Sequence, residues 1–102
     1  MPFITIYVTH SSEFEAKKIW DFLLEKKLIA CYNLFPISSS YWWNWNIENS
    51  NEFVTLLKTK TSNWEIVKEE IKNIHPYKIP CIMKTKVEAN EEYENWIENE
   101  CK

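Results

Sequence analysis

The sequence of 102 residues contains no glycine and no arginine. Without glycine, the chain cannot build phosphate-binding loops of the Walker or dinucleotide type, because those backbones need glycine where they approach the phosphate. Without arginine, it lacks the planar group that pairs with phosphate or guanine through two parallel hydrogen bonds. The net charge of −3 also opposes binding to a polyanion. We therefore expect no nucleic-acid partner.

Cysteines and long apolar runs are also scarce. The three cysteines are odd in number and widely spaced, which is unlike a disulfide framework and favours a reducing compartment. No stretch approaches the roughly twenty apolar residues of a membrane span. The first residues lack the basic and apolar regions of a secretory signal. We expect a cytoplasmic, soluble protein with no membrane partner.

The chain is rich in apolar side chains, which make up 45% of its residues, and six of these are tryptophans. This composition indicates a globular chain rather than a disordered one. The length predicts a single domain spanning residues 1–102.

Hydrophobic periodicity predicts alternating strands and helices, because apolar residues recur at every second position in some segments and every third or fourth in others. The order β-α-β-β-α-β with a terminal helix is the ferredoxin-like α+β plan, an antiparallel sheet with both main helices on one face. The expected elements are strand 3–9, a helix between Ser12 and Lys27, strand 29–35 resuming at 39–43, strand 52–60, a helix between Ser62 and Pro76, strand 81–87, and a short helix after Asn90.

Helix starts are marked by polar residues at the expected boundaries. Ser12 with Glu15, and Ser62 with Glu65, have the spacing of capping boxes at the start of the two main helices. Asn90 is the expected N-cap of the terminal helix.

The long central hairpin carries more aromatic residues than one small core needs. We expect Pro36 to interrupt its first strand, residues 44–46 to turn, and residues 49–51 to form a loop before the second strand. A sheet with helices on one face only, and surplus aromatics beside it, predicts an oligomer that covers the bare face. The alternative is that the tryptophans wrap the core of their own subunit. The aromatic residues in question are Phe35, Tyr41, Trp42, Trp43, Trp45 and Phe53.

The segment from His75 to Cys81 is the strongest candidate site. Its two prolines push the residues before them out of helical geometry, so the backbone is extended and stiff. It carries an imidazole, a phenol and a thiol within seven residues. The simpler alternative is a joint in which His75 caps a helix, Tyr77 packs and Cys81 fills space.

A metal site and a catalytic site are both conceivable from these residues. Cys31, His75 and Cys81 would form a soft site for Cu(I) or Zn(II) if three elements, or two chains, brought them together. Spacing does not demonstrate that convergence. A cysteine nucleophile with His75 as its base would need a motif that the sequence lacks, so an enzyme ranks last.

Separated motifs resemble one family. They are Leu28-Ile29-Ala30-Cys31-Tyr32-Asn33-Leu34-Phe35-Pro36, Ser40-Tyr41-Trp42-Trp43, Lys58-Thr59 with His75-Pro76-Tyr77-x-x-Pro80, and Asn90-Glu91-Glu92-Tyr93-x-x-Trp96-Ile97. In order and in spacing, they resemble the CutA family, the divalent-cation tolerance proteins.

The resemblance implies a tight homotrimer with an architecture like that of the PII signalling proteins. It implies a non-enzymatic role in the response to metal ions, with copper or another divalent metal, or a small ligand, bound in clefts between subunits. A scaffold, or a PII-like signalling trimer without a metal site, is the alternative. The cleft residues that the resemblance implies are Cys31, Tyr41, Trp43, Lys58, His75 and Tyr77.

Three positions depart from the family pattern. Cys81 stands where the family commonly has glutamate, which replaces a hard oxygen with a soft thiol. Trp45 occupies a turn position where the family favours glycine, so we expect a changed turn, or unusual angles at Asn44 and Asn46. A glycine after Pro36 is missing, which shortens the bend toward Tyr41.

Overall fold

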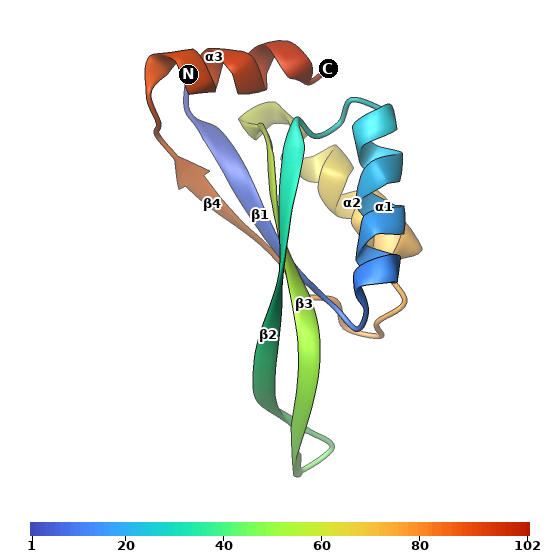
Figure 1. The fold of residues 1–102 in the computed structure, drawn as a ribbon. Helices are drawn as coiled ribbons and strands as arrows, with labels where there is room; N and C mark the ends of the chain where they lie inside the picture. Colours follow the sequence, from blue (N-terminus) through green and yellow to red (C-terminus); the bar gives the residue numbers. More distant parts are fainter.

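The computed structural model of residues 1–102 contains four strands and three α-helices in the predicted order (Figure 1). A 3₁₀ turn over Thr61–Asn63 precedes the second helix. The elements are β1 (Phe3–His10), α1 (Glu13–Glu25), β2 (Cys31–Trp43), β3 (Asn46–Lys60), α2 (Trp64–Ile74), β4 (Ile82–Val87) and α3 (Glu91–Glu100).

The four strands form one antiparallel sheet in the order β2-β3-β1-β4. Helices α1 and α2 lie on the same face of it, and α3 crosses one end, where both chain termini lie (Figure 1). The ferredoxin-like α+β prediction is confirmed. No helix is long and apolar enough to cross a membrane.

The core lies between the sheet and the helices α1 and α2. Along β1, the buried Ile4, Ile6 and Val8 alternate with half-buried residues, because successive side chains of a strand point to opposite faces. They pack in one cluster with Trp20 and Leu23 of α1. We call the opposite face of the sheet, which α1 and α2 do not cover, the open face.

The β2–β3 hairpin extends well beyond the rest of the sheet and gives the molecule a long axis of 45 Å (Figure 1). β1 reaches only to the pair His10 and Phe53, so residues 37–52 are paired with each other alone. We call residues 37–52 the hairpin arm. Trp42 and Trp45 are exposed there, so in this subunit the arm does not wrap its tryptophans around the core.

Two predictions about the arm were wrong. Pro36 does not interrupt β2, and residues 49–51 are strand rather than loop, because pairing runs continuously from Cys31 with Lys58 to Trp43 with Asn46. β2 is an edge strand, and an edge strand tolerates proline since one side of it needs no ladder partner.

The hairpin turn also differs from expectation. Trp45 itself takes a positive φ of 67°, and Asn44 takes 51°, whereas Asn46 begins β3. Two residues with positive φ between paired strands are the pattern of a type I′ turn, whose twist matches the strands. The Trp45 side chain is 95% exposed, so no neighbouring side chain opposes this backbone.

The helices begin and end close to the predicted positions, but only one of the three predicted N-cap residues makes its capping hydrogen bond. The Ser12 hydroxyl accepts a hydrogen bond from the Glu15 N–H at 3.1 Å, which confirms the first cap. Ser62 does not cap α2; Asn63 holds the N-cap position, and its amide instead donates to the Leu28 carbonyl. Asn90 is the N-cap of α3 by position, but its side chain makes no capping bond.

Candidate functional site

The segment after α2 is held by the backbone and ring of His75. Helix α2 ends at Ile74, and His75 turns to an extended conformation (φ −76°, ψ 131°), as the following proline requires. Its ring Nδ1 accepts from the Tyr77 N–H at 3.1 Å, and its Nε2 lies 2.8 Å from the Thr9 carbonyl. Because a carbonyl only accepts, Nε2 carries the proton. His75 therefore joins the segment to β1 through a neutral ring.

A second histidine supports the first from the core. The His10 ring stacks on the His75 ring at 4.7 Å and meets Trp20 edge to face at 5.1 Å. Burial, with a smaller effect of His75, lowers the pKa of His10 to about 4. Its Nδ1 has no hydrogen-bond partner. His10 is thus a neutral packing residue behind the site.

Tyr77 connects the segment to the open face. Its hydroxyl donates to Glu52 Oε2 at 2.6 Å, and its ring lies edge-on to the His75 ring at 4.7 Å. Burial and the hydrogen bond to Glu52 raise the pKa of Tyr77 well above its ordinary value. Burial, followed by the nearby Glu52 carboxylate, likewise raises the pKa of the Cys81 thiol. Burial therefore dominates both shifts, and the Glu52 carboxylate adds to them.

A cavity of about 430 Å³ opens between this segment and the base of the hairpin arm. This volume lies within the range of small-molecule sites. We call it the pocket. The sheet contributes Thr9, Tyr41, Trp43, Glu48 and Glu52 to its lining, and the segment contributes Tyr77, Lys78, Ile79 and Cys81.

Four of the predicted site residues meet at this pocket. Tyr41, Trp43, Tyr77 and Cys81 line it. His75 does not line it but holds Tyr77 from behind, with both ring nitrogens already hydrogen-bonded. The segment is consequently both a stiff joint and one wall of a pocket.

Lys58 and Cys31 lie elsewhere in this subunit. Cys31 of β2 and Lys58 of β3 are partners in the ladder. Lys58 is six residues from Glu52 along β3, a distance of about 20 Å at strand spacing. Lys58 Nζ donates to the Asn33 side chain and to the Tyr93 hydroxyl, both at 3.1 Å, and Cys31 Sγ lies 3.7 Å from that hydroxyl. We call this end of the sheet, under α3, the α3 end.

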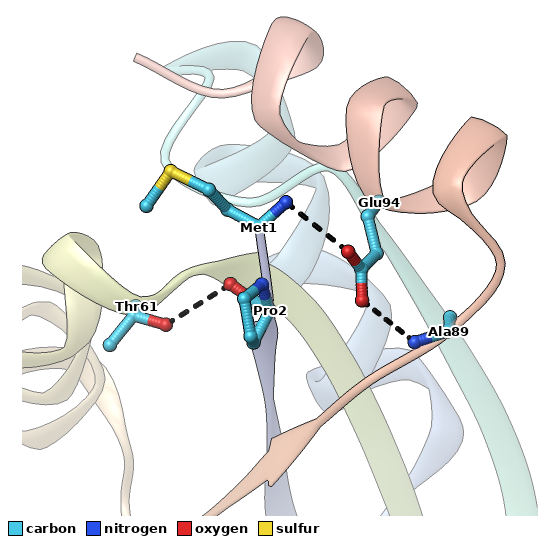
Figure 2. A network of polar contacts seen from close by, with 5 residues as sticks. All are labelled: Met1, Pro2, Thr61, Ala89 and Glu94. Atoms are coloured by element: carbon cyan, nitrogen blue, oxygen red, sulfur yellow. Dashed lines mark hydrogen bonds and ion pairs between the residues drawn. The ribbon is translucent and has the colours of Figure 1, made fainter.

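The α3 end is tied down by the chain itself. Figure 2 shows Glu94 of α3 between two partners, the N-terminal ammonium at 3.2 Å and the Ala89 N–H at 2.8 Å. These contacts lower the pKa of Glu94, the Ala89 hydrogen bond most. Thr61 donates to the Pro2 carbonyl at 3.4 Å beside them. This end is occupied by structural contacts.

The three predicted metal ligands do not meet within one subunit. Cys31 is paired with Lys58, which faces Thr5 of β1, while His75 contacts Thr9. Thr5 and Thr9 are four residues apart, about 13 Å along a strand. No group of three or more His, Cys, Asp or Glu side chains is close enough to hold a metal ion. A site with all three ligands remains a prediction about two subunits.

The analysis of the sequence missed the two carboxylates of the pocket. Glu52 is 8% exposed, and Glu48 lies opposite Tyr41 in the ladder. A signal was available: a two-residue turn at Asn44 and Trp45 fixes the register, and the register pairs Glu48 with Tyr41 and Glu52 with Ile37. The expected loop at residues 49–51 concealed it.

The fold and the pocket define an α+β protein of ferredoxin-like plan, with an aromatic and acidic pocket where its long hairpin leaves the sheet. A model of the CutA1 divalent ion tolerance protein family matches residues 4–100. The chain therefore belongs to the CutA1 family.

Individual relatives agree with the family model along nearly the whole chain. The divalent-cation tolerance protein CutA of Archaeoglobus fulgidus is 43% identical over 94 residues, covering 91% of this chain and 92% of that protein. Its solved structure, which is described as periplasmic, has a TM-score of 0.92 at 40% identity and covers 98% of both chains.

Two further solved structures have the same fold. CutA1 from Pyrococcus horikoshii superimposes with a TM-score of 0.93 at 39% identity, over 97% of this chain and 98% of that one. CutA1 from Oryza sativa gives 0.95 at 29% identity, over 100% and 95% of the two chains. The architecture is thus retained where most residues differ.

Proposed function

We propose that this divalent-cation tolerance protein works as a non-enzymatic homotrimer that binds a metal ion, copper or zinc, or a small ligand where subunits meet. The observation that carries the proposal is the pocket, which Tyr41, Trp43 and Tyr77 line together with Glu52, whose carboxylate accepts a hydrogen bond from Tyr77. It lies on the open face, at the base of the arm. A neighbouring subunit that covers this face turns the pocket into an inter-subunit cleft.

The hairpin arm supports a trimer. An isolated two-stranded hairpin is at best marginally stable in water, yet residues 37–52 have no third strand within the subunit. Exposed apolar side chains on the arm, Trp42, Trp45 and Ile47 among them, favour burial against other subunits. A PII-like arrangement of three sheets around a common axis is the expected assembly.

Cys81 and Glu52 are the pocket residues best suited to a metal ion. The thiol replaces the family's usual carboxylate, and a thiolate ligand selects Cu(I) or Zn(II). Burial, and to a smaller extent the Glu52 carboxylate, raises the pKa of this thiol, and a bound cation would compensate the charge of the thiolate and the carboxylate. His75 would act by holding the segment, since both its nitrogens are engaged.

The raised pKa of Cys81 also supports a non-enzymatic role. A nucleophilic cysteine needs a lowered pKa and a free base beside it. Here burial raises the pKa of the thiol, and the His75 ring has no nitrogen left to accept its proton. A cytoplasmic location is part of the same proposal, because a reducing compartment keeps such thiols free.

Sedimentation equilibrium and calorimetric titration test the proposal. We expect a single trimeric species at micromolar concentration, and binding of Zn(II) or Cu(I) that weakens at least tenfold in Cys81→Ser. Cys101→Ser is the matched control, since Cys101 Sγ lies 3.5 Å from Thr59 Oγ1, away from the pocket, and the variant should leave binding within twofold. A monomer, or equal binding by wild type and Cys81→Ser, would overturn the trimer or the metal site respectively.

A scaffold without a ligand is the second candidate function. The exposed aromatic arm favours it, because such a surface also suits a protein partner. It predicts that the trimer forms while neither metal ions nor small ligands bind the pocket.

A further inference from the structure

We propose that the pocket binds a small organic ammonium ion, a primary amine or a quaternary ammonium compound. This inference rests on the proposed function only in taking the pocket as the ligand site. It differs from a metal site in the groups that make contact: aromatic ring faces as well as carboxylates.

The first argument is the set of aromatic walls. Tyr41 and Trp43 are two residues apart on β2, so their side chains project from the same face of the strand. Tyr77 reaches the same pocket from the segment after α2. Ring faces of Trp and Tyr attract a cation through their quadrupole, and several rings around one site are how proteins recognise substituted ammonium groups.

The second argument is a carboxylate with one oxygen that no group of the chain occupies. Glu52 is 8% exposed; its Oε2 accepts from Tyr77, and its Oε1 makes no hydrogen bond or ion pair. Glu52 Oε1 is not among the buried polar atoms that lack a partner, so it is open to the pocket and can pair with an incoming cation. A primary ammonium can donate a hydrogen bond to Oε1. A quaternary ammonium has no N–H and pairs with the carboxylate through its charge alone, while its carbon substituents contact the rings.

The third argument is the sign of the charge around the pocket. Glu48 and Glu52 lie on the same face of β3, four residues apart, and neither takes part in an ion pair. Lys78 is the one cationic side chain in the lining. Two carboxylates against one ammonium leave a net negative pocket, which favours a cation.

The aromatic content distinguishes an organic cation from a bare metal ion. A metal ion gains little from ring faces and takes oxygen, nitrogen or sulfur ligands instead. Tyr41, Trp43 and Ile79 offer apolar contact that only a ligand with carbon substituents can use. The volume of about 430 Å³ also admits a molecule of several heavy atoms.

Calorimetric titration with choline and with its uncharged isostere 3,3-dimethylbutan-1-ol tests the proposal. We expect choline, or 1,4-diaminobutane as a primary-amine probe, to bind at least tenfold more tightly than the alcohol. Glu52→Gln should weaken choline binding at least tenfold, because it removes the charge that faces the cation. Trp43→Leu should weaken it at least fivefold. Equal binding of choline and the alcohol, or no binding of either amine, overturns the proposal.

Two variants serve as matched controls. Trp96→Leu removes a tryptophan of similar exposure, 42% against 39% for Trp43, which stacks on Tyr93 at the α3 end. Glu98→Gln makes the same charge change on α3. Both should leave choline binding within twofold. If they weaken it as much as the pocket variants do, the ammonium ion binds elsewhere and the proposal is wrong.

The same samples separate this inference from the proposed function. Circular dichroism establishes that each variant is folded, and sedimentation gives its oligomeric state. A trimer that binds Zn(II) through Cys81 but no amine overturns this inference and leaves the metal-binding function intact. A protein that binds choline through Glu52 as a monomer supports this inference and overturns the trimer.

Discussion

The α3 end and the pocket end of the sheet share one face but differ in how their polar groups are satisfied. At the α3 end, Lys58 donates to Asn33 and Tyr93, and Glu94 receives two donors. At the pocket end, Glu52 accepts from Tyr77 through Oε2, while its Oε1 has no partner within the chain and is open to the pocket. The chain supplies its own contacts at one end and leaves them incomplete at the other.

This difference separates residues that stabilise the fold from residues available to a ligand. Buried polar groups are normally paired because an unpaired one costs free energy. The open Glu52 oxygen in a concave, aromatic pocket is therefore available to a ligand, whereas the polar groups of the α3 end are already paired. The family motif residues fall on both sides of this division: Lys58 and Cys31 with α3, and Tyr41, Trp43 and Tyr77 with the pocket.

The largest expected effect is a loss of stability in a variant that weakens the α3 end. Ile97 of α3 is fully buried, so Ile97→Ala should lower the free energy of unfolding by about 2–5 kcal/mol. Ile66→Ala is the control, because Ile66 is half-exposed on α2 and should change stability by about 0.5 kcal/mol or less. Denaturant unfolding measures both. Similar losses in the two variants would show that α3 does not close the core.

The next effect is specific to the pocket end, which carries both histidines. The pKa of His10 is about 4 in the fold, against 6.5 in the unfolded chain, so between these values the unfolded state binds more protons. Stability should be fully present above pH 6.5 and fall by about 3 kcal/mol as the pH drops through 4. His75 is the titratable group that faces His10.

Denaturant unfolding between pH 7.5 and 4 measures this loss, and His10→Gln should flatten the profile. Amide exchange followed by NMR adds location: on acidification the segment around Tyr77 should lose protection before α3 does. Loss of protection in α3 first would contradict the assignment of the acid response to the histidine pair.

The smallest effects compare one tyrosine at each end. Tyr77→Phe removes a hydrogen bond to a buried carboxylate and should cost about 1–2 kcal/mol. Tyr93→Phe removes the hydroxyl that contacts Lys58 Nζ and Cys31 Sγ at the α3 end, and should lower the free energy of unfolding by about 0.5–1 kcal/mol. Thermal unfolding ranks the two variants. The opposite ranking would mean that Glu52 does not depend on Tyr77 for its partner.

The order of elements was predictable because each one carries its own periodicity. Ile4, Ile6 and Val8 alternate, and the burial of Val67 and Ile71 follows the helical spacing of α2. These signals are local, so they survive without knowledge of the rest of the fold. The Ser62 cap failed because Ser62 lies in a 3₁₀ turn and α2 begins only at Trp64. Asn63 then holds the N-cap position, and its amide contacts Leu28, which is distant in sequence.

The pocket was predictable only in part. Tyr41, Trp43 and Tyr77 were identified through their motifs and Cys81 through the stiff segment after His75, whereas Glu52 becomes a site residue only through the register of the hairpin. The division of the motif residues between the two ends depends on where α3 crosses the sheet. That crossing is set by long-range contacts such as Phe3 with Tyr93, which no local pattern reveals.

The most direct test of the central claim, that ligands enter at the pocket end, is an NMR titration of the tryptophan indole N–H signals. Six tryptophans report from different places, with Trp43 in the pocket and Trp96 at the α3 end. With Zn(II) or choline added, the account predicts that the Trp43 signal shifts in a saturable way while the Trp96 signal stays in place. A saturable shift of Trp96 with Trp43 unchanged would contradict it.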